Sequence, residues 1–381
     1  MAAPILGASA AELRRDRTSV KWRLYPADVL PLWVAEMDAA PCPPVVTAVE
    51  AAMRRGDTGY ELGGAYVAAT TRYAVDSWGW EVDPGACRVV ADVMIGVSEL
   101  LRLVTDPGAA VVVSPPCYDS FFGFVEAIGR RVVQAPLTAS GRLDPTSLEV
   151  AFREVSAAGG RAAYLLCNPQ NPTGAVHTPE ELATLAALAE AHGVRVVSDE
   201  IHAPLVHAEA TFTPYLTVPG AERGFAVFSP SKGWNLAGLK AAVAVAGPGA
   251  VDDLRRLHEV HGHGASHVAA IAHTAALDDG REWLAQLLHE LDDNRRLLAA
   301  LLEERLPAVR YRPGEATYLA WLDCRGLGLG DDPARVLLQR GRVALSPGRR
   351  YGAPGSGFAR LNLAASREVI EEAVDRMVGA L

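Results

Sequence analysis

The chain has 381 residues, half of them hydrophobic and 21% charged, which is an ordinary composition for a globular protein. Its length exceeds one typical hydrophobic core, so we expect two domains, or one large domain with a smaller companion. The formal net charge of −9 disfavours a nucleic-acid partner, because contacts to phosphate need a basic face.

The N-terminus and the cysteines bear on where the protein works. The first 15 residues are apolar before they are basic, which is the reverse of a secretory signal. No apolar run approaches the ~20 residues that cross a bilayer. The five cysteines are odd in number and lack CxxC spacing, which disfavours a disulfide framework or a zinc site. We therefore expect a cytoplasmic protein with no membrane partner.

The middle of the chain alternates between strand-like and helix-like patterns. Continuous apolar runs occur at residues 108–116, 162–169, 194–200 and 225–231. Because these runs are continuously apolar, they are typical of strands that helices cover on both faces of a parallel sheet.

The helix between the second and third runs has recognisable ends. Thr178 is a suitable N-cap, Pro179 suits the first helical position and Glu181 completes a capping box. Gly193 follows where a left-handed residue commonly ends a helix. Strand, helix and strand in this order predict a right-handed crossover, so the fold class is α/β with a mostly parallel central sheet.

The C-terminal third has a different pattern. Residues 281–305 form an amphipathic pattern that predicts one long helix, ending before Pro307. Shorter strands are predicted within 317–323 and 358–364, and a last helix from about Arg367. We expect a large domain at residues 40–275, and a smaller α+β domain made of residues 1–39 and 276–381.

Polar side chains follow three of the predicted strands at their carboxyl ends, where ligands of open α/β sheets bind. They are Asn168 and Asn171 after the second run, Asp199 at the end of the third, and Ser229, Ser231 and Lys232 after the fourth. An acid, an amide, hydroxyls and a lysine are the set that a pyridoxal 5'-phosphate (PLP) site requires. The acid keeps the pyridine nitrogen protonated, and the lysine forms a Schiff base and moves a proton. Two alternatives remain, that Asp199 caps a helix and that the asparagines belong to a simple turn.

Lysine is rare in this chain. Of 36 basic residues only Lys21, Lys232 and Lys240 are lysines. Arginine cannot form an imine or exchange protons near neutral pH, whereas lysine can. The lysines are therefore candidates for chemistry, although GC-rich coding bias is an alternative explanation for their small number.

Three motifs in fixed order make a specific resemblance. NPQNPTG (168–174), SDEIH (198–202) and SPSKGWNLAGLK (229–240) resemble the fold type I aminotransferase superfamily of PLP enzymes. Four further segments, at 28–38, 59–66, 317–323 and 355–364, resemble its cystathionine β-lyase-like branch, the MalY/PatB family of C–S lyases. The similarity extends from about Lys21 to Arg367. It implies the PLP-dependent transferase fold of type I.

The resemblance also implies roles around the cofactor ring. Lys232 would hold PLP as a Schiff base and carry the substrate Cα proton, and Asp199 would pair with the pyridine nitrogen. Asn171 would hydrogen-bond the ring hydroxyl and lie beside the substrate. His202 is a further candidate for that hydroxyl, with a purely structural histidine as the alternative. Tyr118 would stack on the ring, with an ordinary core tyrosine as the alternative.

The resemblance places the cofactor phosphate at the start of a helix. It assigns the phosphate to Gly96, Val97, Ser98, Ser229, Ser231 and Lys240. Backbone N–H groups at a helix start, hydroxyls and a cation are suitable phosphate ligands. Tyr60 resembles a tyrosine that reaches the phosphate from the neighbouring subunit, which implies a homodimer with shared active sites.

The substrate side is implied in the same way. Arg360 would bind the substrate α-carboxylate, with a surface ion pair as the alternative, and Trp33, Val34 and Ala35 would line the substrate pocket. The Gly233–Trp234 pair departs from the family pattern, and Trp234 is large enough to reshape that pocket.

The implied activity is β-elimination from cystathionine or another S-substituted L-cysteine. An aminotransferase acting on an L-amino acid, or a regulatory protein that retains the fold, are the alternatives. Four histidines at 258–267 suggest a metal site, but the interleaved glycines give no regular ligand geometry, so we expect no metal.

Overall fold

The central sheet has seven strands in the computed structural model, which describes residues 3–381. In spatial order they are β2 (Cys87–Val90), β8 (Ala242–Ala246), β7 (Phe225–Phe228), β6 (Arg195–Asp199), β5 (Ala163–Cys167), β3 (Ala110–Val113) and β4 (Arg131–Gln134). The strands from β7 to β4 are parallel, and β8 is antiparallel to both of its neighbours. Each of the four predicted strands is present, so the predicted α/β class is confirmed.

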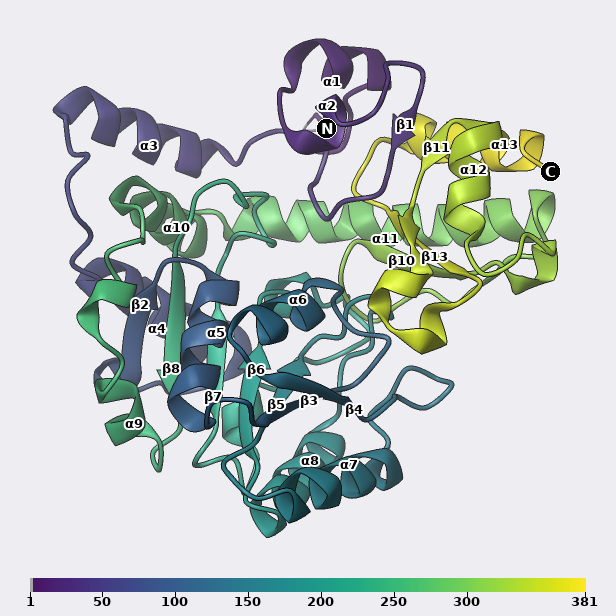
Figure 1. The fold of residues 1–381 in the computed structure, drawn as a ribbon. Helices are drawn as coiled ribbons and strands as arrows, with labels where there is room; N and C mark the ends of the chain where they lie inside the picture. Colours follow the sequence, from purple (N-terminus) through teal and green to yellow (C-terminus); the bar gives the residue numbers. More distant parts are fainter. Residues whose placement is uncertain (1–2) are drawn as a thin grey trace.

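Helices cover both faces of this sheet, which is why its strands are continuously apolar. They are α3 (Pro43–Arg55), α4 (Gly64–Trp78), α5 (Val93–Val104), α6 (Ser120–Ala127), α7 (Pro145–Ala157), α8 (Pro179–Ala191), α9 (Val251–Arg255) and α10 (His267–Asp279). Side chains of α5, α6 and α9 pack on one face, and those of α7 and α8 on the other. In Figure 1 α7 and α8 lie below the sheet, and α5 lies in front of it.

The predicted crossover helix has the predicted ends. The Thr178 hydroxyl accepts a hydrogen bond from the Glu181 N–H at 3.2 Å, and the Glu181 carboxylate accepts one from the Thr178 N–H at 2.8 Å. Gly193 has a φ of +66°. The capping box and the left-handed glycine are therefore confirmed, and they bring the chain from β5 to the neighbouring parallel strand β6.

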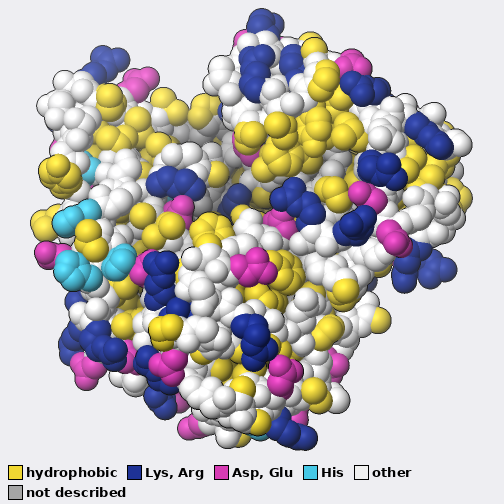
Figure 2. Space-filling model, viewed as in Figure 1, with side chains coloured by type: hydrophobic (Ala, Val, Ile, Leu, Met, Phe, Trp, Pro, Cys, Tyr) yellow, Lys and Arg dark blue, Asp and Glu magenta, His cyan; other side chains and the backbone are white. Residues whose placement is uncertain are grey.

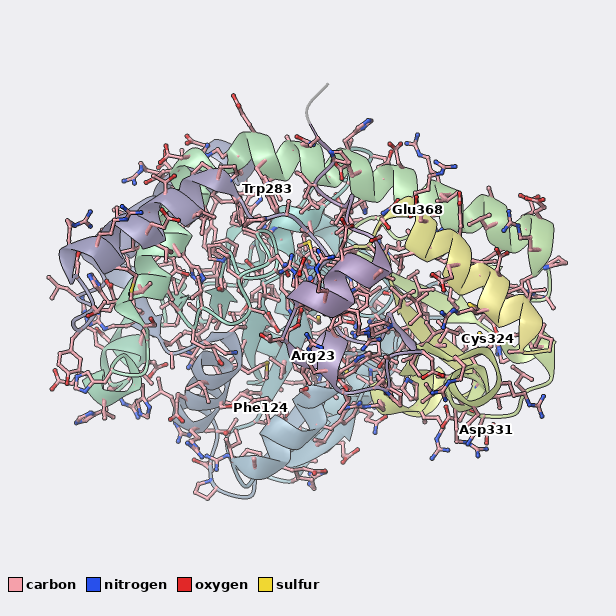
Figure 3. The ribbon with its side chains drawn as sticks, turned by 90° about the horizontal axis from the view of Figure 1, so that it is seen from above. Arg23, Phe124, Trp283, Cys324, Asp331 and Glu368 are labelled. Atoms are coloured by element: carbon pink, nitrogen blue, oxygen red, sulfur yellow. The ribbon has the colours of Figure 1, made fainter. Side chains whose placement is uncertain are left out.

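A second sheet is built from the C-terminal third. Its order is β12 (Ser346–Pro347), β13 (Phe358–Asn362), β10 (Leu319–Asp323) and β9 (Arg310–Tyr311), all antiparallel. The helices α11 (Arg281–Arg305), α12 (Pro333–Gly341) and α13 (Arg367–Gly379) pack on it, and a short 3-10 turn, η6 (Gly348–Tyr351), follows β12. Figure 3 shows α11 along one side of the molecule with α13 beside it. The predicted long helix and both strands are present.

The N-terminal segment joins this second region. Helices α1 (Ala10–Asp16) and α2 (Val20–Arg23) precede β1 (Leu30–Pro31), which pairs in parallel with β11 (Val343–Ala344). Figure 1 shows α1 and α2 above the central sheet, close to the C-terminal elements. None of the helices within residues 3–381 combines the length and apolar character needed to cross a membrane.

Candidate active site

A cavity of about 300 Å³ opens at the carboxyl edge of the central sheet. Figure 2 shows the molecule hollowed on this face, between the part that carries α3 and α10 and the part that carries α1 and α2. The predicted residues that line the cavity are Trp33, Val34, Ala35, Tyr118, Asn171, Asp199, His202, Ser229, Ser231, Lys232, Lys240 and Arg360. The structure thus brings together side chains that are spread over most of the sequence.

Strand topology explains the central part of this group. β5, β6 and β7 are parallel neighbours, so their carboxyl ends meet at one edge. Asn171 follows β5, Asp199 is the last residue of β6, and Lys232 lies four residues after β7 ends.

The Lys232 amine lies against the N-terminal segment. Its Nζ atom donates a hydrogen bond to the Ala35 carbonyl oxygen at 2.6 Å. Burial, together with the positive charges of Arg360 and Lys240, lowers the pKa of Lys232 to about 8. An amine with this pKa is partly unprotonated near neutral pH, which is the form that attacks a carbonyl group.

Asp199 is a buried acid, with 4% of its surface exposed. Burial raises the pKa of its carboxyl group to about 7, against smaller opposing effects of the Ile201 N–H and Lys232. The Ile201 N–H donates to Oδ1 at 3.1 Å, which is a local turn bond and not a helix cap. A buried carboxyl group in a cavity wall is suited to a cationic partner such as a protonated pyridine nitrogen.

Arg360 lies on β13 and is 5% exposed, so the alternative of a surface ion pair is wrong. Its two terminal nitrogens donate to Asn171 Oδ1 and to the Trp33 carbonyl oxygen, each at 3.1 Å. Its Nε atom is buried and has no hydrogen-bond partner among residues 3–381. The Tyr351 ring lies 5.1 Å from the guanidinium carbon. A buried guanidinium that no carboxylate within residues 3–381 neutralises is suited to bind a carboxylate ligand.

His202 is buried beside the same groups. Burial and the charges of Lys232 and Arg360 lower the pKa of His202 to about 3, so its ring is neutral at physiological pH. Its Nδ1 atom has no hydrogen-bond partner in the described part of the chain. A neutral imidazole with a free nitrogen can bond to a ring hydroxyl.

Tyr118 also lines the cavity, and burial raises the pKa of its phenol, which stays protonated.

The predicted start of the phosphate-binding helix is wrong by three residues. Helix α5 begins at Val93 after Asp92, whose carboxylate accepts a hydrogen bond from the Ile95 N–H at 2.8 Å. The Gly96 N–H is already bonded inside the helix, to the Asp92 carbonyl oxygen at 2.9 Å. A Cβ atom on Gly96 would lie 2.7 Å from Val90 Cγ2, so this glycine serves the packing of α5 on the sheet.

Asp92, Val93 and Met94 line the cavity at this end, whereas Gly96, Val97 and Ser98 do not. An aspartate directly before an apolar run is itself an N-cap signal, and it could have identified the helix start. The Lys240 amine lies 3.2 Å from the Asp92 carboxylate. An N-terminal helix turn, a lysine and two serines therefore face one end of the cavity, a donor set that fits a phosphate group.

The N-terminal segment is fixed by contacts that the sequence did not reveal. Lys21 and Asp38 form a fully buried ion pair at 2.8 Å, and Trp22 donates to the same carboxylate at 2.8 Å. Asn235, three residues after Lys232, exchanges two hydrogen bonds with the Met37 backbone, each at 2.9 Å. The third lysine thus has a structural place, holding the segment that reaches the cavity.

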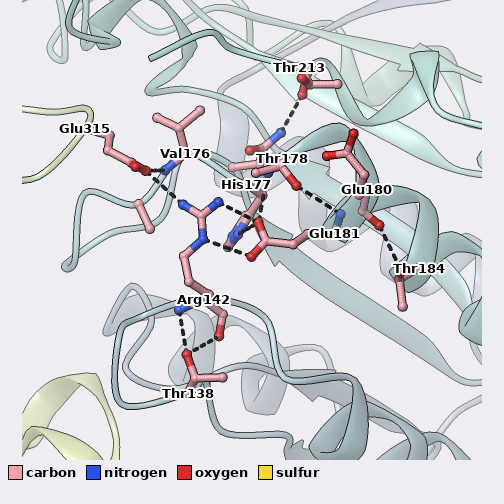
Figure 4. Close-up of polar contacts among 12 residues, drawn as sticks. Thr138, Arg142, Val176, His177, Thr178, Glu180, Glu181, Thr184, Thr213 and Glu315 are labelled. Carbon is pink, nitrogen blue, oxygen red and sulfur yellow. Dashed lines mark hydrogen bonds and ion pairs between the residues drawn. The ribbon is translucent and has the colours of Figure 1, made fainter. Parts of the chain in front are cut away.

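A second set of ion pairs, drawn in Figure 4, holds the segment from Val176 to Glu181, which follows Asn171 in the chain. Arg142 donates to both carboxylate oxygens of Glu181, at 2.9 and 2.7 Å, and to Glu315 at 2.8 Å. The Glu315 carboxylate also accepts from the Val176 N–H at 2.9 Å. The network ties the segment after β5 to the chain that enters β10. These contacts join residues far apart in sequence, which no local motif indicated.

The structure also shows where Trp234, Tyr60 and the histidine cluster at 258–267 lie. Trp234 is 1% exposed, donates to the Gly280 carbonyl oxygen at 2.9 Å and does not line the cavity, so the idea that it reshapes the pocket is wrong. Tyr60 is 95% exposed and lies outside its own cavity. His267 pairs with Glu61 at 2.7 Å and Asp57 at 3.1 Å. Residues 3–381 hold no group of three or more potential metal ligands.

A buried lysine, a buried acid at the end of the neighbouring strand, a helix start with a lysine and two serines, and a buried arginine meet in one cavity, and this set fits pyridoxal 5'-phosphate. Residues 81–377 match the family described as aminotransferase class I and II, and the chain belongs to this family. PLP is its cofactor.

Individual relatives indicate which branch of the family the chain resembles. The chain is 50% identical to a protein of Mycobacterium tuberculosis (strain H37Rv) named "Putative cystathionine beta-lyase", over 99% of this chain and 98% of that one. It is 34% identical to "Cystathionine beta-lyase" of Corynebacterium glutamicum, over 96% and 98% of the two chains. A solved Corynebacterium diphtheriae structure titled a PLP-dependent beta-cystathionase has a TM-score of 0.92 at 35% identity, covering 99% and 98%. These similarities support the C–S lyase branch of the family.

Proposed function

We propose that this enzyme is a C–S lyase that cleaves cystathionine or another S-substituted L-cysteine by α,β-elimination. The products are a thiol, pyruvate and ammonia. The observation that carries the proposal is the meeting of Lys232, Asp199 and Arg360 in one cavity, in a chain 50% identical to the Mycobacterium tuberculosis protein named "Putative cystathionine beta-lyase".

The residues present fit the cofactor. Asp199 would hold the pyridine nitrogen, Asn171 and His202 the ring hydroxyl, and Tyr118 the ring face. Ser229, Ser231, Lys240 and the first turn of α5 would hold the phosphate. When bound, PLP supplies an electron sink that stabilises negative charge at the substrate Cα atom.

Side chains of the protein bind the substrate and move the proton. Arg360 holds the substrate α-carboxylate, which fixes the bond from Cα to hydrogen beside Lys232. The Lys232 Nζ atom removes the Cα proton, and the bond from Cβ to sulfur breaks with its electron pair leaving on the thiolate. The unsaturated amino acid that remains reacts with water to give pyruvate and ammonia.

Incubation with L-cystathionine tests the proposal. We expect pyruvate and free thiol in equal amounts, and a visible absorbance band of the bound cofactor that is lost in Lys232→Ala. An aminotransferase uses the same residues and differs in where the proton returns. Glutamate formed from added amino acid and 2-oxoglutarate, with no pyruvate from cystathionine, would overturn the lyase assignment. Purified protein that binds no PLP would favour the regulatory alternative.

We also propose a homodimer with shared active sites. The segment around Tyr60 supports it, because Tyr60 and Leu62 are 95% and 97% exposed, an unusual state for two large side chains so close together. Tyr60 would reach the phosphate of the partner's cofactor. Mixing two impaired dimers, Lys232→Ala and Tyr60→Ala, tests this, because a mixed dimer with shared sites has one intact site and regains activity. No recovery after subunit exchange, shown by mass spectrometry, would contradict it.

The expected partner is a small amino-acid substrate, and the proposed compartment is the cytoplasm. The five cysteines support this compartment, since all are buried and unpaired, which suits reducing conditions.

A further inference from the structure

The segment that carries Tyr60 has an alternating pattern of exposure. Tyr60 and Leu62 are 95% and 97% exposed, whereas the Glu61 side chain between them is 8% exposed. In an extended chain alternate side chains point to opposite sides, so a contact that holds Glu61 inward also holds its two neighbours outward. The partners of Glu61 therefore decide how Tyr60 and Leu62 are presented to another molecule.

The Glu61 carboxylate is held at both of its oxygens. Oε2 lies 2.7 Å from His267 Nδ1, and Oε1 accepts a hydrogen bond from the Gly63 N–H at 2.5 Å. His267 is the first residue of α10, and Gly63 is the N-cap residue of α4. Tyr60 also forms an isolated antiparallel bridge with Ser266, which directly precedes α10. The Tyr60 segment is thus tied to the starts of two helices.

Both ring nitrogens of His267 face carboxylates. Nδ1 meets Glu61, and Nε2 lies 3.1 Å from Asp57 Oδ1. A neutral imidazole has one N–H group and one lone pair, so it donates to only one of these acids, whereas an imidazolium donates to both. The geometry therefore requires the protonated form. In agreement, the hydrogen bond to Glu61 raises the pKa of His267 above its ordinary value of 6.5, against a smaller lowering by burial.

The helix itself does not need this cation. A positive charge at the N-terminus of a helix opposes the helix dipole, so an imidazolium at the start of α10 is unfavourable for the helix alone. Ser266 already caps α10, because its hydroxyl accepts from the Ala269 N–H at 3.2 Å. The Ser266 N–H also donates to the Lys240 carbonyl oxygen at 2.9 Å. The contacts that remain for the His267 ring are those with Glu61 and Asp57.

The other charged groups around His267 have partners of their own. Arg55 Nη2 lies 3.5 Å from Asp57 Oδ2, so Asp57 is shared between an arginine and the histidine. Because the Asp57 side chain is 47% exposed, solvent screens this pair, and Glu61 is the stronger partner of His267. Further neighbours are paired elsewhere: Arg54 with Glu50 at 3.7 Å, His258 with the Val260 N–H at 3.2 Å, His261 with Glu99 at 3.5 Å, and Lys240 with Asp92 at 3.2 Å.

We propose that protonated His267 is a positioning residue for subunit pairing, which holds Glu61 inward and so presents Tyr60 and Leu62 to a second copy of this chain. A neutral ring keeps at most one of the two hydrogen bonds, and that bond is no longer charge-assisted. Loss of one proton therefore releases the Tyr60 segment and weakens the dimer. This inference rests on the proposed homodimer and adds to it a residue and a pH dependence.

The direction of the pH dependence follows from the raised pKa of His267. The contacts are complete below the ordinary value of 6.5 and are lost as pH rises through the higher value of the folded protein. Subunit exchange between holoenzyme samples that carry a fluorescent donor or acceptor measures the effect. We expect the exchange rate of the unaltered protein to rise by about tenfold or more between pH 6 and pH 9.

Two variants separate the proton from the size of the side chain. His267→Gln has no charge to lose, so exchange should be fast at pH 6 and should change less than about twofold up to pH 9. His267→Lys keeps a cation throughout this range, because the pKa of lysine is ordinarily about 10.4, and exchange should stay slow up to pH 9. Fast exchange of His267→Lys at pH 6, or a His267→Gln profile identical to that of the unaltered protein, would overturn the proposal.

His192→Gln is the matched control. His192 Nε2 lies 3.0 Å from Glu149 Oε2, and its side chain is 19% exposed, close to the 23% of His267. It follows α8 and pairs with α7, outside the Tyr60 segment. Its exchange rates should match those of the unaltered protein at each pH. If His267→Gln does not fold, Glu61→Gln replaces it, since it removes the charge from the stronger contact while α10 stays unaltered, and it should exchange faster at pH 6.

A second measurement separates this inference from the proposed homodimer. A monomer mass for the unaltered holoenzyme at every pH would overturn the homodimer. Hydrogen exchange at the amides of residues 57–63, measured by mass spectrometry, then still tests the His267 contacts. We expect exchange at pH 6 to be about tenfold faster in His267→Gln than in the unaltered protein, because the segment opens more often. Equal rates in the two proteins at pH 6 would overturn the role of His267.

Discussion

Two regions build the cavity, and they are held in different ways. The carboxyl edge of the central sheet supplies Asn171, Asp199 and Lys232 through the order of neighbouring parallel strands. The N-terminal segment supplies Ala35, whose carbonyl oxygen meets Lys232 across 197 positions of sequence. Backbone pairing fixes the first region, whereas side-chain contacts such as the Lys21–Asp38 pair fix the second. Changes at the sheet edge should therefore impair chemistry, and changes in the N-terminal segment should impair stability first.

The largest effect is expected at the sheet edge. Lys232→Ala removes the group that we propose moves the Cα proton, so we expect kcat/KM to fall by about 10⁴-fold or more. The fold should persist, because the substitution removes a cation whose pKa is already lowered by burial. Pyruvate release and thermal unfolding, measured side by side, check both parts. If the variant loses its activity because it unfolds, the expectation that changes at the sheet edge impair chemistry and not stability is wrong.

The N-terminal segment should respond in the opposite way. Lys21→Met leaves the buried Asp38 carboxylate unpaired, which we expect to destabilise the protein by about 3–5 kcal/mol. The double variant Lys21→Met/Asp38→Leu removes both charges and should recover part of that loss. Urea unfolding gives both values. A single variant as stable as the unaltered protein would show that the pair does not anchor the segment.

This contrast explains what the sequence could predict. Asn171, Asp199 and Lys232 follow strands with clear apolar patterns, so their meeting at one edge followed from topology alone. The ends of helix α8, at Thr178 and Gly193, could also be predicted from the sequence, because helix capping depends on neighbouring residues only. The Lys21–Asp38 pair and the Arg142 network join distant positions, and no local pattern specifies such contacts. The domain limits at residues 39–40 and 275–276 stay a prediction.

The raised pKa of Asp199 should make the stability of the cofactor-free protein depend on pH. Its folded pKa of about 7 exceeds the ordinary value of 3.8, so the folded state binds more protons between these values. Stability should therefore fall as pH rises from about 4 to 7, by an amount on the order of 2–4 kcal/mol. Glu200, whose pKa burial also raises to about 7, adds to this decline.

Comparison with the Asp199→Asn variant separates the contribution of Asp199 to this pH dependence from that of Glu200. The variant should lose less stability over the same pH range, as measured by urea unfolding at pH 5 and pH 7. Binding of PLP should remove the difference, because a cationic nitrogen beside the carboxylate offsets the cost of burying it. An identical pH dependence in both proteins would contradict a raised pKa at Asp199.

The smallest effect concerns the corrected helix start. Gly96→Ala places a Cβ atom 2.7 Å from Val90 Cγ2, and we expect a loss of about 1–2 kcal/mol in unfolding free energy. The affinity for PLP should stay within about twofold, because Gly96 lies outside the cavity and its N–H already bonds to the Asp92 carbonyl oxygen. Titration of the cofactor-free variant with PLP measures that affinity. Weak PLP binding by a stably folded variant would return Gly96 to the phosphate site and move the cup one helical turn along α5.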